Sequence, residues 1–279
     1  MIIIAESGST KTNWITADNT LYQTKGFNPL FDTTDSIYAE LVKHEELQKV
    51  RNNFTQVFFY GASCSSDERN AIVEKALSKY FTNTEVIQVD HDLKAAAVAT
   101  YDNRPGIACI LGTGSNSCFY DGHEIYEEVP SLGYVLGDEG SGAYFGKKII
   151  AAFLYHELPE ATHKILVENY KLEKEEVLKH VYKQPNANVY LATFAKVMNE
   201  TSDTEYMDKL AEEGFTDFFN HHVACYKNYQ QYPVHFVGSI AFHFKHVLEI
   251  VAKKKGCELG KVDRNPVYSL LNWHLQNSK

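Results

Sequence analysis

The sequence has no apolar run near the roughly 20 residues that a membrane-spanning helix needs. Its apolar start, residues 1–5, is also shorter than the hydrophobic segment of a secretory signal peptide. We therefore expect a chain that makes no use of a membrane and that resides in the cytoplasm.

Positive charge is scarce, since 27 lysine and arginine residues stand against 36 aspartate and glutamate residues, for a formal net charge of -9. The basic residues form one short cluster, 253–255. Such a surface repels a phosphate backbone, so we expect no nucleic-acid partner.

Paired cysteines are missing as well. The five cysteines are odd in number, widely spaced and contain no CxxC pair, which argues against a disulfide framework and against a zinc knuckle. Low-complexity tracts and flexible linkers are absent too. What remains is a composition, 44% hydrophobic, typical of a globular protein with a sizeable core.

Two segments open in the same way, which indicates an internal repeat. Each is an apolar run, 2–5 in one case and 106–111 in the other, that enters a turn rich in glycine and hydroxyl side chains. Short strands joined by hairpin turns are expected after each run, because turn residues separate the apolar segments. These strands cover 13–16 and 20–25 in the first half, and 117–120 and 124–129 in the second.

Helices and further strands are expected after these meanders. Ser65 and Glu68 have capping-box spacing before a helix that extends to Tyr80, and a strand follows over 85–89. Asp92 is expected to cap the next helix. The turn at 103–105 ends that helix and marks the boundary between a first domain, 1–104, and a second, 105–265.

The second domain should contain a helical insertion from 141 to about 232, interrupted at 184–186. A buried strand over 234–237 is expected to lead into one helix containing Phe242, His246 and Val247. The chain then closes with an amphipathic segment, 266–275.

Two turns have the chemistry of an anion-binding loop. The sequence ESGSTKT (6–12) and the sequence GTGSNS (112–117) both place small residues and hydroxyl groups between two strands, so that backbone amides can converge on an anion. The spacing differs from that of a P-loop, and a strand follows instead of a helix. Each turn alone is also compatible with an ordinary hairpin, whereas the pair favours a clamp for a polyphosphate.

Acidic groups follow these loops. Two adjacent acids lie in the glycine-rich run GDEGSG (137–142), where they face a ligand, a magnesium ion or only solvent. Asp92 with His91 stands at the end of a strand, the usual place for sites in α/β proteins. At a helix N-terminus Asp92 should be held ionised, which suits a base that accepts a hydroxyl proton. A plain helix cap is the alternative for Asp92.

In this order the motifs resemble those of the BadF/BadG/BcrA/BcrD ATPase family, and specifically its N-acetylglucosamine kinase branch in the actin, sugar kinase and Hsp70 superfamily. The resemblance spans nearly the whole chain. It rests on ESGSTKTNW, GFNP, DHDLKAAA, LGTGSNS, GDEGSG, VGSIA and the segment that begins at Asn265.

The resemblance implies an α/β fold of two RNase H-like domains around a central nucleotide cleft, with the last helix, about 266–279, packing back on the first domain. It implies ATP and Mg²⁺ as cofactors and an amino sugar, foremost N-acetylglucosamine, as the acceptor of phosphate at its 6-hydroxyl. The implied nucleotide-binding positions are Gly8, Ser9, Thr10, Lys11, Thr12, Gly112, Thr113, Gly114, Gly238 and Ser239. The implied sugar-binding positions are Asn28, Asp92, Thr113, Asn116, Gly133 and Asp138, with Asp92 as the catalytic base.

Two positions depart from the family pattern. Glu6, the implied magnesium residue, stands where the family has aspartate, and its longer arm indicates contact through water and reduced activity. Leu132 replaces an aromatic residue beside the sugar. Glucosamine, N-acetylmuramic acid and a muropeptide fragment therefore stay open as substrates.

Two other functions compete with the kinase. The same family contains ATPases that activate 2-hydroxyacyl-CoA dehydratases, although these hold an iron-sulfur cluster for which no cysteine pair is suitably placed. Glu6 also fits a sugar-binding sensor without catalysis. The sequence leaves open whether the chain is a monomer or a homodimer.

Overall fold

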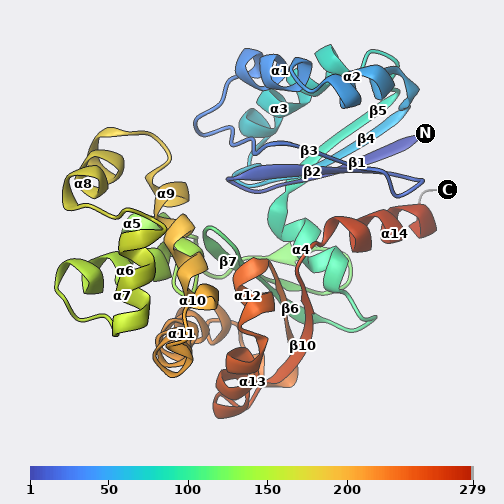
Figure 1. The fold of residues 1–279 in the computed structure, drawn as a ribbon. Coiled ribbons are helices and arrows are strands. Elements are labelled where there is room, and N and C mark those ends of the chain that lie inside the picture. Colours follow the sequence, from blue (N-terminus) through green and yellow to red (C-terminus); the bar gives the residue numbers. More distant parts are fainter. Residues whose placement is uncertain (278–279) are drawn as a thin grey trace. The chain divides into compact units, whose positions relative to one another are not determined.

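The computed structural model describes residues 1–277, in which the chain forms two compact units (Figure 1). Unit 1 comprises Met1–Asp102 together with the segment that begins at Asn265, and unit 2 comprises Asn103–Arg264. The expected α/β class is confirmed, since each unit has helices and a mixed five-stranded sheet within the described residues. The predicted domains, 1–104 with the last helix and 105–265, stay a proposal beside these units. Residues 278–279 of the predicted last helix lie outside the described part.

The sheet of unit 1 has the strand order β3-β2-β1-β4-β5. β1 pairs antiparallel with β2 and parallel with β4. Its run of isoleucines is buried on both faces, as expected for a central strand whose side chains are β-branched. The strands are β1 (Ile2–Ser7), β2 (Lys11–Thr16), β3 (Leu21–Lys25), β4 (Gln56–Gly61) and β5 (Val86–His91).

Aromatic side chains fill the core of unit 1. Trp14 is fully buried and contacts Phe59 and Phe81 with ring centroids 6.0 and 5.8 Å away. Burial of each such side chain contributes about 1.5–3 kcal/mol. This core anchors β2, and with it the turn between β1 and β2.

The helices of unit 1 include two whose starts differ from the prediction. α3 is capped by Ser66, whose side chain accepts from the Arg69 backbone N–H, so the cap predicted at Ser65 was wrong by one residue of a serine pair. Asp92 is the first residue of α4 and not its cap, because His91 still has extended backbone. The helices are α1 (Thr34–Val42), α2 (Glu45–Val50), η1 (Arg51–Asn53), α3 (Asp67–Tyr80), α4 (Asp92–Thr100) and α14 (Val267–Asn277).

Helix α14 completes unit 1 by packing on α4, β1 and β2. Its His274 is buried, accepts or donates a hydrogen bond at 2.9 Å with the Tyr60 hydroxyl, and lies against Phe58 at a centroid distance of 4.0 Å. The amphipathic closing segment predicted from the sequence is therefore a helix of unit 1.

The sheet of unit 2 repeats the topology of unit 1, with the strand order β10-β9-β6-β7-β8. β6 pairs antiparallel with β7 and parallel with β9, so the predicted repeat is confirmed. The strand predicted over 124–129 covers only two residues, because the acids that follow are exposed at a sheet edge. The strands are β6 (Gly106–Leu111), β7 (Ser115–Tyr120), β8 (Ile125–Tyr126), β9 (Pro233–Val237) and β10 (Glu258–Asp263).

The helical insertion of unit 2 is confirmed, including its break between Lys183 and Ala187. The single helix predicted around Phe242 is two helices, because Phe244 leaves the helical conformation. The helical elements are α5 (Gly133–Leu136), α6 (Gly142–Leu154), α7 (Glu160–Glu168), α8 (Lys174–Lys183), α9 (Ala187–Thr193), η2 (Phe194–Lys196), α10 (Val197–Glu200), α11 (Thr204–Phe218), the π-helical turn η3 (Phe219–Val223), η4 (Tyr229–Gln231), α12 (Ser239–His243) and α13 (Lys245–Lys254).

Over residues 1–277, no helix has both the length and the apolar character needed to span a membrane.

Candidate functional site

The first glycine turn is a three-residue connection, Gly8 to Thr10, between β1 and β2. The Gly8 backbone N–H donates to the Lys11 carbonyl at 3.0 Å and closes the turn. A Cβ built on Gly8 meets only that carbonyl, at 4.0 Å, and Gly8 does not have a left-handed φ. Neither packing nor backbone conformation therefore requires glycine here, whereas close approach of a ligand would require it.

Hydroxyl groups beneath this turn hold it in place. Ser7 and Thr12 are fully buried, their hydroxyl oxygens lie 2.7 Å apart, and Thr12 donates to the Lys25 carbonyl at 3.0 Å. The Phe27 backbone N–H donates to the Ser7 hydroxyl at 3.0 Å. We therefore assign the Thr12 side chain to support of the turn, while Ser9, Thr10 and Lys11 remain on its accessible side.

The expected sugar loop, 26–29, is attached to the same turn. The Gly26 backbone N–H donates to the Thr10 carbonyl at 3.2 Å, and a Cβ on Gly26 would lie 2.1 Å from the Gly8 carbonyl. Asn28 accepts from the Leu30 backbone N–H through its side-chain oxygen at 2.9 Å. Its own backbone N–H donates to Asp32 at 2.9 Å. The loop and the turn thus form one rigid edge of unit 1.

Asp92 opens α4 directly after β5, where its side chain is 22% exposed. Its Oδ1 lies 3.4 Å from His91 Nε2. Burial raises the pKa of Asp92, although His91 and the Leu93 backbone N–H lower it. Desolvation thus works against the ionised form that the helix N-terminus is expected to favour. A raised pKa brings the carboxyl nearer to the working pH of a general base.

Glu6 lies on β1, opposite Asn13 of β2. The Asn13 amide donates to Glu6 Oε2 at 3.4 Å, and the Asn13 side-chain oxygen accepts from Gln23 at 3.0 Å. A half-buried carboxylate held in this way can face a hydrated cation.

The second glycine turn, Gly112 to Thr113 and Gly114, has the same three-residue length and joins β6 to β7. The Gly112 and Thr113 carbonyls accept from the first backbone N–H groups of α6, Gly142 and Ala143, at 2.8 and 3.0 Å. A Cβ on Gly112 meets nothing within 4 Å, and Gly112 also lacks a left-handed φ. The two turns thus share one unexplained feature, a glycine that the fold does not need.

Asp138 is tied to this second turn. Its Oδ1 accepts from the Ser115 backbone N–H at 3.2 Å, and the residue is 6% exposed with a left-handed φ of 60°. Burial raises the pKa of Asp138, while the Ser115 N–H and Lys147 lower it. Backbone strain and a desolvated carboxyl in one residue are typical of ligand sites.

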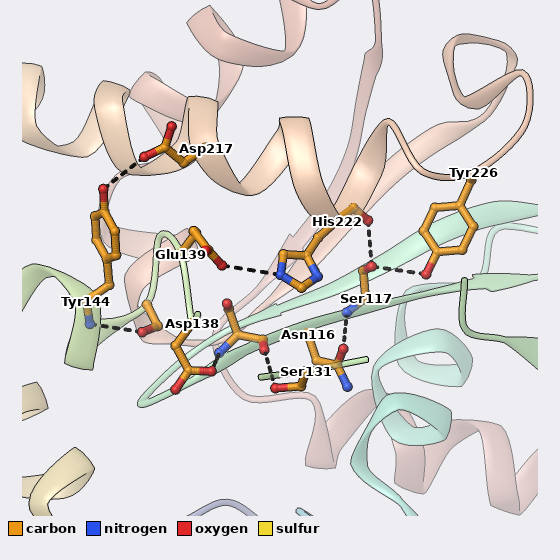
Figure 2. A network of polar contacts seen from close by, with 11 residues as sticks. Asn116, Ser117, Ser131, Asp138, Glu139, Tyr144, Asp217, His222 and Tyr226 are labelled. Atoms are coloured by element: carbon orange, nitrogen blue, oxygen red, sulfur yellow. Dashed lines mark hydrogen bonds and ion pairs between the residues drawn. The ribbon is translucent and has the colours of Figure 1, made fainter. Parts of the chain in front are cut away.

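The neighbouring acid, Glu139, belongs to a polar network that sequence reasoning missed (Figure 2). Its Oε2 lies 3.4 Å from His222 Nε2, and the His222 carbonyl accepts from Ser117 at 2.6 Å. Ser117 also contacts the Tyr226 hydroxyl at 3.0 Å. Nothing in the helical pattern around residue 222 distinguishes this histidine from a surface one.

The remaining predicted positions lie in unit 2. Gly238 has a φ of 116°, and a Cβ there would lie 2.4 Å from the Leu111 carbonyl, so packing already requires glycine. Ser239 is exposed at the start of α12. Gly133 has a φ of 69° with open space around it. Asn116 accepts from the Ser117 backbone N–H at 2.9 Å and is half-buried.

Magnesium would have to bind here with few protein ligands. Residues 1–277 contain no group of three or more His, Cys, Asp or Glu side chains arranged to hold a metal ion. Mg²⁺ often keeps several waters and binds through one or two carboxylates plus phosphate oxygens, so Glu6 fits that mode. The predicted site residues thus form two sets, one on unit 1 and one on unit 2.

The whole chain resembles a protein of related sequence. The structure of this chain superimposes with a TM-score of 0.93 on that of the putative N-acetylglucosamine kinase of Porphyromonas gingivalis. The two sequences are 36% identical over 100% of both chains. The chain belongs to the N-acetylglucosamine kinase-like family of sugar kinases.

Two more distant kinases share the actin-like fold of this family. The putative N-acetylglucosamine kinase of Chromobacterium violaceum matches at a TM-score of 0.65, 15% identity and 98% of both chains. A ROK family glucokinase of Streptomyces griseus, in complex with glucose and AMPPNP, matches at 0.51, 11% identity and 97% of both chains. No family model matches the sugar kinase described here, and no curated protein matches it either.

Proposed function

We propose that this sugar kinase transfers the γ-phosphoryl group of ATP to an amino sugar, with the 6-hydroxyl of N-acetylglucosamine as the foremost acceptor. The observation that carries the proposal is the pair Gly8 and Gly112. Each stands at the tip of an equivalent hairpin, and neither is required by packing or backbone conformation.

The nucleotide is assigned to these two tips. Phosphate oxygens approach backbone N–H groups closely only where side chains are absent. Gly8, Ser9, Thr10 and Lys11 supply one set of contacts, and Gly112, Thr113 and Gly114 supply the other, with Gly238 and Ser239 on the adenosine side. The glucokinase structure with AMPPNP supports a nucleotide on this fold.

The base is Asp92. It would orient the acceptor hydroxyl and take its proton during attack on the γ-phosphorus, a role for which its raised pKa is suited. Mg²⁺, near Glu6, would neutralise charge on the phosphate oxygens. Removing a general base typically lowers the rate by about 10²- to 10⁴-fold.

The sugar is assigned to the positions that the family resemblance implies, which are Asn28, Asp92, Thr113, Asn116, Gly133 and Asp138. Asp138 is the best supported, because its carboxyl is buried, strained and next to a glycine turn. The identity of 36% to a protein named for N-acetylglucosamine favours that sugar over glucosamine or N-acetylmuramic acid.

A panel of amino sugars with ATP and Mg²⁺, read by ADP release and by mass spectrometry of the product, tests the proposal. We expect N-acetylglucosamine to give the highest kcat/KM and its 6-phosphate as product. Asp92→Asn is the control and should bind sugar but release ADP at less than about 1% of the normal rate. Sugar binding by calorimetry without any phosphorylated product over hours would instead indicate a sensor.

A further inference from the structure

A buried histidine, His222, contacts the turn of unit 2 that carries Asp138 and Glu139. His222 is 5% exposed and belongs to the π-helical turn η3, a kind of element that is frequent at functional sites. Its Nε2 faces Glu139, as Figure 2 shows. The distance from Nε2 to Glu139 Oε2 is 3.4 Å. The Glu139 side chain, in contrast, is 20% exposed.

The protonation of His222 follows from its surroundings. Burial lowers its pKa, although the Glu139 carboxylate raises it, and the net direction favours the neutral ring, which has one N–H. Its Nδ1 is buried without a hydrogen-bond partner among the described residues. Because an orphaned N–H is rarer than an orphaned acceptor, the proton belongs on Nε2, which donates to Glu139.

The ring of His222 is itself held in place. It stacks on Phe218 with centroids 5.1 Å apart and planes at 20°, and its carbonyl accepts from Ser117. Ser117 directly follows Asn116, one of the proposed sugar contacts. Rotation of the ring would break its contact with Glu139 and its stacking on Phe218, so the histidine presents a fixed donor.

Glu139 therefore keeps one oxygen engaged with His222, while its side chain remains 20% exposed. Lys147 is the cation near both acids, since Asp138 and Glu139 each raise its pKa while burial lowers it. Its amine, however, donates to the Tyr134 carbonyl. The contact with His222 thus orients Glu139 beside Asp138.

We propose that Glu139 accepts a hydrogen bond from an O–H group of the bound reactants, and that His222 is the positioning residue that holds Glu139 for this contact. The donor is either a hydroxyl of the sugar or a water on Mg²⁺, which share the same chemistry. The inference rests on the proposed kinase function and adds two residues to its site.

Three variants test it: Glu139→Gln, His222→Leu and His222→Gln. Leucine fills the ring's volume without a donor, whereas glutamine restores a donor near the position of Nε2. Each variant is assayed for sugar KM, kcat and the half-saturating Mg²⁺ concentration, and titrated with sugar and with Mg-ATP by calorimetry. Thermal unfolding confirms that each variant is folded.

We expect Glu139→Gln and His222→Leu to weaken the same ligand by about tenfold, the scale of one charge-assisted hydrogen bond, and His222→Gln to restore most of it. A change in the sugar constants identifies a sugar hydroxyl, and a change in the Mg²⁺ constant identifies a metal-bound water. The double variant Glu139→Gln with His222→Leu should be no worse than either single variant.

The inference is overturned if Glu139→Gln leaves all these constants within twofold. It is also overturned if His222→Leu and His222→Gln are equally impaired, because the histidine then serves packing alone. A protein that binds ligand but transfers no phosphate would reject the kinase function and still test Glu139 by calorimetry. A protein that binds neither ligand would reject both.

Discussion

The carboxylate of Asp138 accepts a hydrogen bond from the backbone N–H of Ser115 at 3.2 Å, across 23 residues of chain. Both carboxylate oxygens also lie 3.1 Å from the point that a Cβ on Gly114 would occupy. The turn that carries Asp138 is therefore bonded to the second glycine turn, and a change in either should alter the other.

Two glycine-to-alanine variants in that turn should separate binding from folding. Gly112→Ala meets no protein atom within 4 Å, so we expect stability within about 0.5 kcal/mol of the parent and an ATP KM raised by about tenfold or more. Gly114→Ala meets Asp138 and should lose about 1–3 kcal/mol of stability as well. Thermal unfolding and ATP titration of both variants provide the measurement. An unchanged ATP KM in Gly112→Ala would contradict the assignment of the nucleotide.

Asp92→Asn should make the protein more stable at pH 7 while it lowers turnover to less than about 1% of the normal rate. A carboxyl whose pKa is raised in the folded state loses folding free energy as the pH rises from the unfolded pKa of 3.8 through the folded one. Neutral asparagine removes this penalty. A lower melting temperature for the variant at pH 7 would show that neighbouring groups compensate the negative charge of Asp92.

The same shift predicts the pH profile of the reaction. The base works when deprotonated, so kcat/KM should fall on the acidic side around the raised pKa of Asp92, above the ordinary range of an aspartate. A pH series of kcat/KM under saturating Mg-ATP measures this limb. An acidic limb at or below pH 3.8 would remove Asp92 from this role.

Glu6→Asp should raise the rate. The substitution shortens the arm by about 1.5 Å and gives the aspartate that the family resemblance implies at the proposed magnesium position. It also withdraws the carboxylate from Asn13, whose amide now lies 3.4 Å from Oε2. Initial rates across a Mg²⁺ series, with Glu6→Gln as the uncharged control, provide the test. Equal rates for the aspartate and glutamine variants would mean that this position does not contact the metal.

Lowering the pH should destabilise unit 1 through the titration of His274. Burial lowers the pKa of His274 from 6.5 to about 4, so between these values the unfolded chain takes up a proton that the folded chain does not. The titration of His274 leaves the free energy of unfolding unchanged above pH 6.5. It lowers that free energy as the pH falls from 6.5 to about 4. His274→Gln keeps a partner for the Tyr60 hydroxyl but does not titrate. The difference in melting temperature between parent and variant should therefore narrow or reverse from pH 7 to pH 4.

The sequence predicted the parts of the fold that local pattern controls. The repeat of apolar run, glycine turn and hairpin appeared in both halves because the residues that build it are adjacent. The break at Pro185 was predicted for the same reason. β10 was not predicted, because its sequence, ELGKVD, alternates weakly and pairs with β9 only through long-range contacts.

Prediction of the site had a similar limit. Short motifs pointed to Gly8, Gly112 and Asp138, and the structure adds reasons that motifs do not contain, such as the space around each glycine. The role of His222 could not be predicted, because its partner Glu139 lies 83 residues away in the sequence. Thr12 stays a predicted nucleotide contact, although its fully buried side chain supports the turn, which the motif alone does not indicate.

The place of α14 has a consequence for biosynthesis. This helix packs on α4, β1 and β2, yet the ribosome makes it only after all of unit 2. Unit 1, which is translated first, therefore keeps the apolar face that α14 covers exposed until unit 2 has been translated. A nascent chain halted near residue 264 would consequently be the form most in need of a chaperone.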